Sequence, residues 1–124
     1  MKILFLSSSL APHFGGAAFS ESALSSELSK EHEVIVLSRQ DRIDREFAAR
    51  QGIKLVKTFT PFSVLFAFLN PWHSLNKEIQ DSDIFHLNGH WFWENYFFAR
   101  LCYRYQVPYV LHPRGMLWVA YRKP

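Results

Sequence analysis

"MKILFLSSSLAPHFGGAAFSESALSSEL", Met1 to Leu28, is the stretch that decides the fold. Its uninterrupted apolar segment, Ile3 to Leu6, has the length of a buried strand and is too short for the apolar region of a secretory signal peptide. A loop with Pro12 and a glycine pair follows, and the sequence after the pair suits a helix. The stretch therefore predicts a strand, a glycine-containing loop and a helix.

The same alternation of short apolar runs and longer helical segments continues along the chain. Runs of this kind are typical of strands buried on both faces of a sheet, and we expect strands at Ile3–Leu6, Val34–Leu37, Ile53–Val56, Ile84–Leu87 and Tyr109–Leu111. Helices are expected at Ala17–Lys30, Arg42–Gln51, Phe62–Gln80, where a break at Asn70 and Pro71 stays open, and Phe92–Tyr105. Right-handed crossovers between the strands then give an α/β fold, a Rossmann-like doubly wound parallel sheet.

The helix expected after the glycine pair has one apolar face. Ala17, Leu24 and Leu28 share that face by their helical spacing, whereas Ser22 and Ser25 point elsewhere. The pattern predicts that the two leucines are buried against the sheet.

Length and composition restrict the class of protein. A chain of 124 residues suits one domain with a single core, and 48% hydrophobic and 17% aromatic residues exclude a disordered chain. Cys102 is the only cysteine, which excludes an intramolecular disulfide and a cysteine-rich zinc site. We therefore expect a reducing, cytoplasmic location. The sequence also has no apolar run near the roughly 18 residues of a membrane-spanning helix.

The basic excess of the chain is concentrated in one segment. Six basic and three acidic residues lie between Arg39 and Lys57, whereas eight of each lie elsewhere. This segment could attract anionic lipid headgroups, phosphates or nucleic acid, or it could be a solvated helix face. The Phe-rich segment FTPFSVLFAFLNPW follows it. A basic face beside exposed aromatics would suit peripheral contact with the inner face of a membrane, and core packing of the phenylalanines is the alternative.

The glycine pair points to an anion. The loop from the first strand into the first helix lies at the carboxyl edge of a doubly wound sheet, where ligands bind. Gly15 and Gly16 would let a ligand approach the backbone, and the first helical turn favours a phosphate or carboxylate. The segment fits neither the dinucleotide fingerprint nor the P-loop. A simple turn into the helix, and a flavodoxin-type FMN site at Ser7 to Ser9, remain as alternatives.

The segment DIFHLNGHWFWEN, residues 83–95, carries two histidines four residues apart, His86 and His90. That spacing serves metal ligands on a helix, but the segment is expected to be a strand followed by a turn, so we predict no metal site.

The loop that follows the same strand is a candidate for ligand binding. We expect Asn88, His90 and Trp91 to bind substrate there, with Trp93 beside them, because indole faces and an imidazole can hold a sugar or another polar ligand. Packing of the aromatic side chains between loop and helix is the alternative.

The segment VPYVLHPRGMLW, residues 107–118, delivers His112 and Arg114 to the same edge of the sheet. The planar guanidinium of Arg114 could clamp a phosphate or a hydroxyl-rich ligand, or it could pair with a carboxylate as a structural ion pair. The sequence has no G-x-S-x-G elbow and no evident carboxylate pair, so hydrolase chemistry has no support.

Together, four motifs carry a resemblance that covers nearly the whole chain. P-x-x-GG follows the first strand, EHEVIVLS covers the second, DIFHLNGHW the fourth and VPYVLHPRGML the fifth. In this order they resemble the N-terminal domain of family 4 glycosyltransferases, the glycosyl transferase group 1 type. The resemblance implies the GT-B architecture, in which two Rossmann-like domains face each other across a cleft. It also implies transfer of a sugar from a nucleotide-sugar donor with retention of configuration, usually without a metal.

The resemblance further implies roles for individual residues. Gly15 and Gly16 would approach the donor phosphates through their backbone. Arg114 stands where related sequences have a histidine that faces the donor sugar, and His112 lies two residues earlier. Arg114 and His112 are therefore the candidate catalytic residues.

The resemblance implies that residues 1–124 form a single N-terminal, acceptor-side domain, truncated at its C-terminal end. Most nucleotide contacts would come from the missing C-terminal domain, which carries an Arg/Lys pair and an E-x7-E motif. The expected partners are a nucleotide-sugar donor and a glycan or lipid-linked acceptor, with no cofactor and no nucleic acid. A non-catalytic Rossmann-like binding module, a truncated gene product and a flavodoxin-like FMN binder remain as alternatives.

Overall fold

The computed structural model describes residues 1–7, 15–38, 41–50, 53, 55–88 and 93–113. Five strands form one parallel sheet in the order β3-β2-β1-β4-β5. Each strand lies within two residues of the position that its apolar run predicts, so the α/β, doubly wound parallel fold is confirmed. The bounds are β1 Lys2–Ser7, β2 Glu33–Ser38, β3 Leu55–Thr58, β4 Ile84–Asn88 and β5 Tyr109–His112.

The strand order also decides between two kinds of nucleotide-binding fold. The order reverses between β1 and β4, as in the Rossmann order 3-2-1-4-5, whereas flavodoxin-like sheets have the order 2-1-3-4-5. The flavodoxin-like alternative is therefore wrong at the level of the fold. The reversal places the crevice that binds ligands in such sheets beside the carboxyl ends of β1 and β4.

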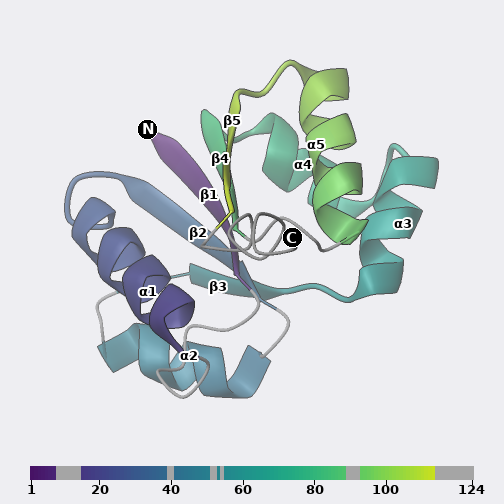
Figure 1. Ribbon diagram of the computed structural model, residues 1–124. Coiled ribbons are helices and arrows are strands. Elements are labelled where there is room, and N and C mark those ends of the chain that lie inside the picture. The colour runs from purple at the N-terminus through teal and green to yellow at the C-terminus, as the bar shows by residue number, and fades with distance from the viewer. Residues whose placement is uncertain (8–14, 39–40, 51–52, 54, 89–92, 114–124) are drawn as a thin grey trace, which may run out of the picture.

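Helices cover both faces of the sheet (Figure 1). On one face lie α1 and α2, and on the other lie α3, α4 and α5. The helix bounds are α1 Gly16–Leu28, α2 Asp41–Arg50, α3 Pro61–Leu69, α4 Ser74–Gln80 and α5 Trp93–Tyr105. The break considered at Asn70 and Pro71 is confirmed. Thr60 begins α3 with a reciprocal capping box to Ser63.

Two apolar layers hold the helices to the sheet. Between the sheet and α3–α5, Phe98 packs edge-on against Phe59 and Phe85, at centroid distances of 5.6 and 5.3 Å. On the opposite face, Phe5 and Val36 pack with Ala48 of α2. Because both layers are buried, β1 and β2 in the middle of the sheet are apolar on both sides, which explains their uninterrupted apolar sequences.

The buried face of α1 differs from the expected one. Leu24 is 37% exposed and Leu28 is half-buried, whereas Ser22 and Ser25 are buried. Ser25 satisfies its hydroxyl by donating to the carbonyl oxygen of Glu21 at 2.7 Å, one turn earlier. The apolar-face prediction is therefore wrong for Leu24, because the helix turns a small and polar face inward, where short side chains allow close packing.

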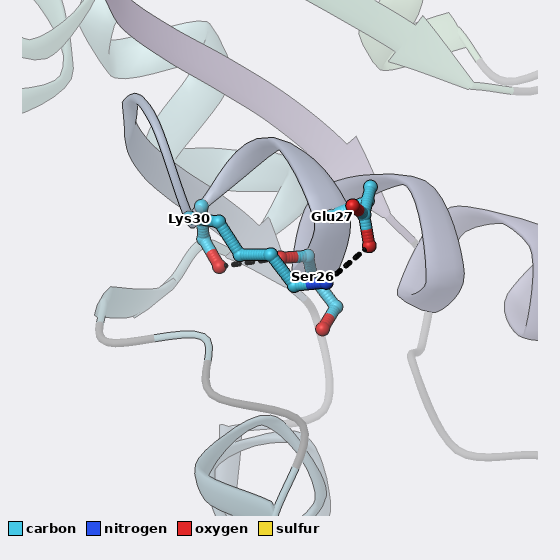
Figure 2. A network of polar contacts seen from close by, with 4 residues as sticks. Ser26, Glu27 and Lys30 are labelled. Carbon is cyan, nitrogen blue, oxygen red and sulfur yellow. Dashed lines mark hydrogen bonds and ion pairs between the residues drawn. The ribbon is translucent and has the colours of Figure 1, made fainter.

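Beyond its last turn α1 is held by local contacts at the surface. Lys30 pairs with Glu27 at 2.6 Å, and the Ser29 hydroxyl donates to the carbonyl oxygen of Ser26 (Figure 2). Both charged side chains are about 70% exposed, so the ion pair contributes no more than about 1 kcal/mol. Burial of the helix, and not this network, attaches α1 to the sheet.

The helix of the basic segment, α2, and the helix of the Phe-rich segment, α3, lie on opposite faces of the sheet. The basic segment contains α2, which packs against β1 and β2 through Ala48, whereas α3 packs in the other layer. The expectation of a basic face beside exposed aromatics is therefore wrong for the basic residues of α2, Arg45 and Arg50. Phe59 is buried, but Phe62 and Phe66 are 70% and 59% exposed, so core packing accounts for only part of the segment.

None of the helices in the described part of the chain combines the length and the apolar character needed to cross a bilayer.

Candidate functional site

Polar side chains gather at the carboxyl ends of the strands. Ser7 lies beside Ser38 in the register of β1 and β2, and Asn88 lies beside His112 in the register of β4 and β5. Ser7, Ser38 and Asn88 are at most 5% exposed. We call this edge of the sheet the carboxyl-edge site. Since buried polar groups require hydrogen-bond partners, we expect these side chains to form an ordered polar network there.

The glycine pair forms the entry to α1 at this site. Gly15 is the N-cap residue, with φ 99° and ψ −170°, a conformation that residues with a side chain rarely adopt. Gly16 is the exposed first residue of the helix, and a Cβ there would meet no atom of the described residues within 4 Å. The backbone at position 15 thus strongly favours glycine, and among the described residues the space beside a Cβ is open at both positions.

A buried carboxyl group lies behind the glycine pair. The Ser7 hydroxyl donates to Glu21 Oε2 at 2.5 Å, and Glu21 is only 5% exposed. This short bond ties the end of β1 to the second turn of α1 and so positions the helix N-terminus over the strand. Sequence reasoning missed Glu21, because hydrophobic spacing does not place a glutamate on a buried helix face.

Asn88 lies at the site with its side chain turned into the sheet. Its side-chain amide nitrogen donates to the carbonyl oxygen of Leu6 at 2.8 Å, and its backbone carbonyl oxygen accepts from Asn95 Nδ2 at 3.3 Å. The side chain therefore joins β4 to β1 at the point where the strand order reverses. Direct binding of substrate by Asn88 remains a prediction.

Two histidines on neighbouring strands form a pair. His86 Nδ1 and His112 Nε2 are 3.1 Å apart, and the two ring planes differ by 16°. The Phe5 ring lies on His86 with a centroid distance of 4.6 Å and an angle of 11°. Both histidines are half-buried. Sequence reasoning considered them separately, because it had no register to join positions 26 residues apart.

The first turn of α5 adds buried polar groups to the same edge. Glu94 and Asn95 are 1% and 5% exposed, and the helix N-terminus favours a carboxylate at Glu94. Trp93 is 48% exposed and meets Phe97, one turn later in the same helix, edge-on at 5.6 Å. His90, Trp91 and Arg114 lie outside the described residues.

Metal and thiol chemistry receive no support from the described residues. Within the described ranges, no three His, Cys, Asp or Glu side chains are grouped so that they could hold a metal ion. Desolvation raises the pKa of the buried Cys102 thiol from 9.0 to about 12, although a backbone hydrogen bond opposes the shift. A nucleophilic thiolate is therefore disfavoured there.

A surface hollow lies at the other end of the sheet. It has a volume of about 680 Å³ and is lined by residues from Cys102 to Tyr109, between the end of α5 and the start of β5. Because ligands of doubly wound sheets bind at the carboxyl ends of the strands, this hollow is not the candidate site.

Comparisons with known proteins show which known fold this chain resembles. No protein-family model matches the sequence, and no curated protein matches it either. Among solved structures, the chain is similar to Anabaena Alr3699/HepE, a GT-B glycosyltransferase crystallised in complex with UDP and glucose. The TM-score is 0.65 at 23% sequence identity, over 90% of this chain.

The same comparison defines how much of that protein is matched. This chain spans 29% of the HepE chain. The similarity shows that the described fold is an α/β, Rossmann-like fold that matches part of a GT-B glycosyltransferase.

Proposed function

We propose that the chain is the N-terminal, acceptor-side domain of a retaining GT-B glycosyltransferase. The enzyme moves a sugar from a nucleotide-sugar donor to a glycan or lipid-linked acceptor, in the synthesis of a surface polysaccharide, glycolipid or similar glycan. Residues 1–124 supply one wall of the active site, and a C-terminal domain supplies the other.

One observation carries the proposal. Gly15, with its positive φ, opens the N-terminus of α1 next to the reversal of strand order between β1 and β4. The N–H groups of a first helical turn lack partners within the helix and attract phosphate. The similarity to a structure that holds UDP and glucose agrees with a nucleoside diphosphate as the anion.

The residues differ in their proposed roles. The backbone of Gly15 and Gly16 meets the donor phosphates, and the Ser7–Glu21 bond holds the helix that carries them. His112, at the end of β5, faces the reacting sugar together with Arg114, while His90 and Trp91 bind the acceptor or the sugar. Asn88 acts through the sheet, because its amide is bonded to Leu6.

Sugar-transfer and binding measurements test this proposal. Isothermal titration with nucleotide sugars and a radiolabelled transfer assay compare residues 1–124 with the same chain extended by its downstream coding sequence. We expect binding and turnover only for the extended polypeptide, since an open half-site cannot position both reactants. Robust turnover by residues 1–124 alone would show that the second domain is not needed.

A non-catalytic Rossmann-like module, or a truncated gene product, is the competing function. An in-frame stop directly after Pro124 in the gene would favour it, whereas continuation of the reading frame into an E-x7-E segment would favour the transferase.

We also propose that α3 carries the peripheral membrane contact. Phe62, Phe66 and Leu69 form one helical stripe, between 59% and 70% exposed, and Trp72 beyond it is 93% exposed. No Asp, Glu, Lys or Arg lies between residues 58 and 76. A bilayer can therefore receive this surface without desolvating a charge, with the tryptophan at the level of the headgroups.

Cationic groups border the α3 surface. Arg104 of α5 donates to the carbonyl oxygen of Phe68 at 3.0 Å, and its guanidinium lies 4.7 Å from the Phe68 ring centroid. Lys77 of α4 shares a surface hollow with Trp72, together with Asp81. A basic residue near an anionic membrane contributes about 1 kcal/mol to binding. Arg104 and Lys77 therefore supply the positive charge near the membrane that the sequence analysis expected from the Arg39–Lys57 segment.

Sedimentation with vesicles tests the membrane contact. The chain should pellet with vesicles containing phosphatidylglycerol and less with pure phosphatidylcholine. Phe62→Ser combined with Phe66→Ser should abolish pelleting, whereas Phe19→Ser, which removes a 66% exposed phenylalanine from α1, should not. Pelleting that ignores anionic lipid, or that survives the double substitution, would contradict the proposal.

A further inference from the structure

We infer that His86 is a positioning residue that fixes the ring of His112 at the carboxyl-edge site. This inference deepens the proposed function, on which a catalytic use of His112 rests, but the hydrogen bond itself is independent of that function. The inference rests on the 3.1 Å contact between His86 Nδ1 and His112 Nε2.

The contact has the geometry of a hydrogen bond between two imidazoles. The ring centroids are 5.2 Å apart and the planes differ by only 16°, so the near edges of two almost parallel rings meet through their nitrogens. A distance of 3.1 Å lies within the range of nitrogen donors. One nitrogen must then carry a hydrogen and the other must offer its lone pair.

The strands fix the two rings in place. His112 sits opposite Asn88 in the register of β4 and β5, which puts His86 diagonally across from it on the same face of the sheet. Phe5 of β1 covers the His86 ring nearly face to face. His86 is thus held from one side by an aromatic ring and holds His112 on the other.

The hydrogen bond links the tautomers of the two rings, because it engages Nε2 of His112 and Nδ1 of His86. In the neutral pair, the two rings must carry their protons on the same kind of nitrogen. If His86 donates from Nδ1, His112 holds its proton on Nδ1; if His112 donates from Nε2, His86 holds its proton on Nε2.

Imidazole nitrogen NMR tests the inference without any substrate. In chain labelled with ¹⁵N-histidine, His86 and His112 should each show one neutral tautomer, and the two tautomers should match. His73 supplies the internal reference, because its Nδ1 accepts the backbone N–H of Leu75 at 3.2 Å and its neutral ring must carry the proton on Nε2.

Three substitutions separate a positioning role from simple packing. His86→Phe keeps a ring against Phe5 and removes the hydrogen bond, so His112 should change to a mixture of tautomers. His86→Asn places an amide close to the original Nδ1 and should restore a single tautomer. His86→Gln places its amide at the Nε2 position and should not. Thermal unfolding followed by circular dichroism shows that each variant is folded.

Two results would overturn the inference. One is a mixture of His112 tautomers in the unaltered chain, and the other is a His112 spectrum that His86→Phe leaves unchanged. A matched pair of tautomers combined with an extended polypeptide that transfers no sugar would retain the hydrogen bond and refute only the proposed function.

Discussion

Alanine substitution at the two neighbouring glycines should have opposite effects on stability. Gly15 has φ 99° and ψ −170°, in a region of backbone conformation that is almost restricted to glycine, so Gly15→Ala should lower the free energy of unfolding by about 1–3 kcal/mol. Gly16 begins α1, and a Cβ there meets open space among the described residues. Gly16→Ala should therefore be neutral or stabilise the chain by up to about 1 kcal/mol, because alanine loses less backbone entropy in a helix.

Urea unfolding followed by far-UV circular dichroism measures the difference. The midpoint should fall for Gly15→Ala and stay or rise for Gly16→Ala, with the same denaturant slope for both. Equal losses in the two variants would show that the backbone at Gly15 is not held at a positive φ. The reasoning that the backbone favours glycine more strongly at position 15 than at position 16 would then fail.

Three further changes probe the core and the buried polar groups. Glu21→Ala leaves the Ser7 hydroxyl without its carboxyl acceptor and should cost about 1–3 kcal/mol in denaturant unfolding, more than Glu21→Gln, which keeps an acceptor oxygen. Phe98→Ala empties a fully buried site between two aromatic rings and should lower the free energy of unfolding by about 3–5 kcal/mol. A much smaller loss, measured by calorimetry, would show that neighbouring side chains collapse into the space. Cys102, with its pKa at about 12, should resist iodoacetamide at pH 8.5 until urea unfolds the chain. Because that folded pKa is raised, the contribution of Cys102 to stability is complete below pH 9 and is lost as the pH rises toward 12, a decline that Cys102→Ala should lack.

The sequence predicted β1 and β2 because both are buried on both sides. The run Tyr109–Leu111 also predicted a strand, β5, but that strand lies at the edge of the sheet and its three residues are 38% to 46% exposed. A strand such as β2, with apolar layers above and below it, must be an uninterrupted apolar run, and such a run is readable without a structure. The break between α3 and α4 was readable for a similar reason, since Pro71 marks a helix boundary locally.

The face of α1 was not readable from hydrophobic spacing. Glu21 and Ser25 are buried because their polar groups find partners in Ser7 and in the helix backbone, whereas Leu24 is left 37% exposed. A rule that places leucines inside and glutamates outside fails where a hydrogen bond compensates the burial of a polar group.

The histidine pair depends on which strands are neighbours. His86 and His112 meet only because β4 and β5 are adjacent and parallel in a particular register. The α2 and α3 segments show the converse, because they follow each other in the chain and yet pack on opposite faces of the sheet. Both outcomes follow from the topology of crossovers, which local sequence patterns do not encode.

The affinity of the extended polypeptide for nucleotide sugars, with UDP-glucose as the first probe, is the measurement that tests the central claim most directly. Calorimetric titration should show binding by the unaltered protein and at least tenfold weaker binding by Gly16→Val, whose side chain would occupy the open space above the helix N-terminus. Ala49→Val, at an exposed position of α2, is the matched control and should bind as the unaltered protein does. Equal affinity in Gly16→Val and Ala49→Val, with both variants folded, would contradict the placement of the donor phosphates at the glycine pair.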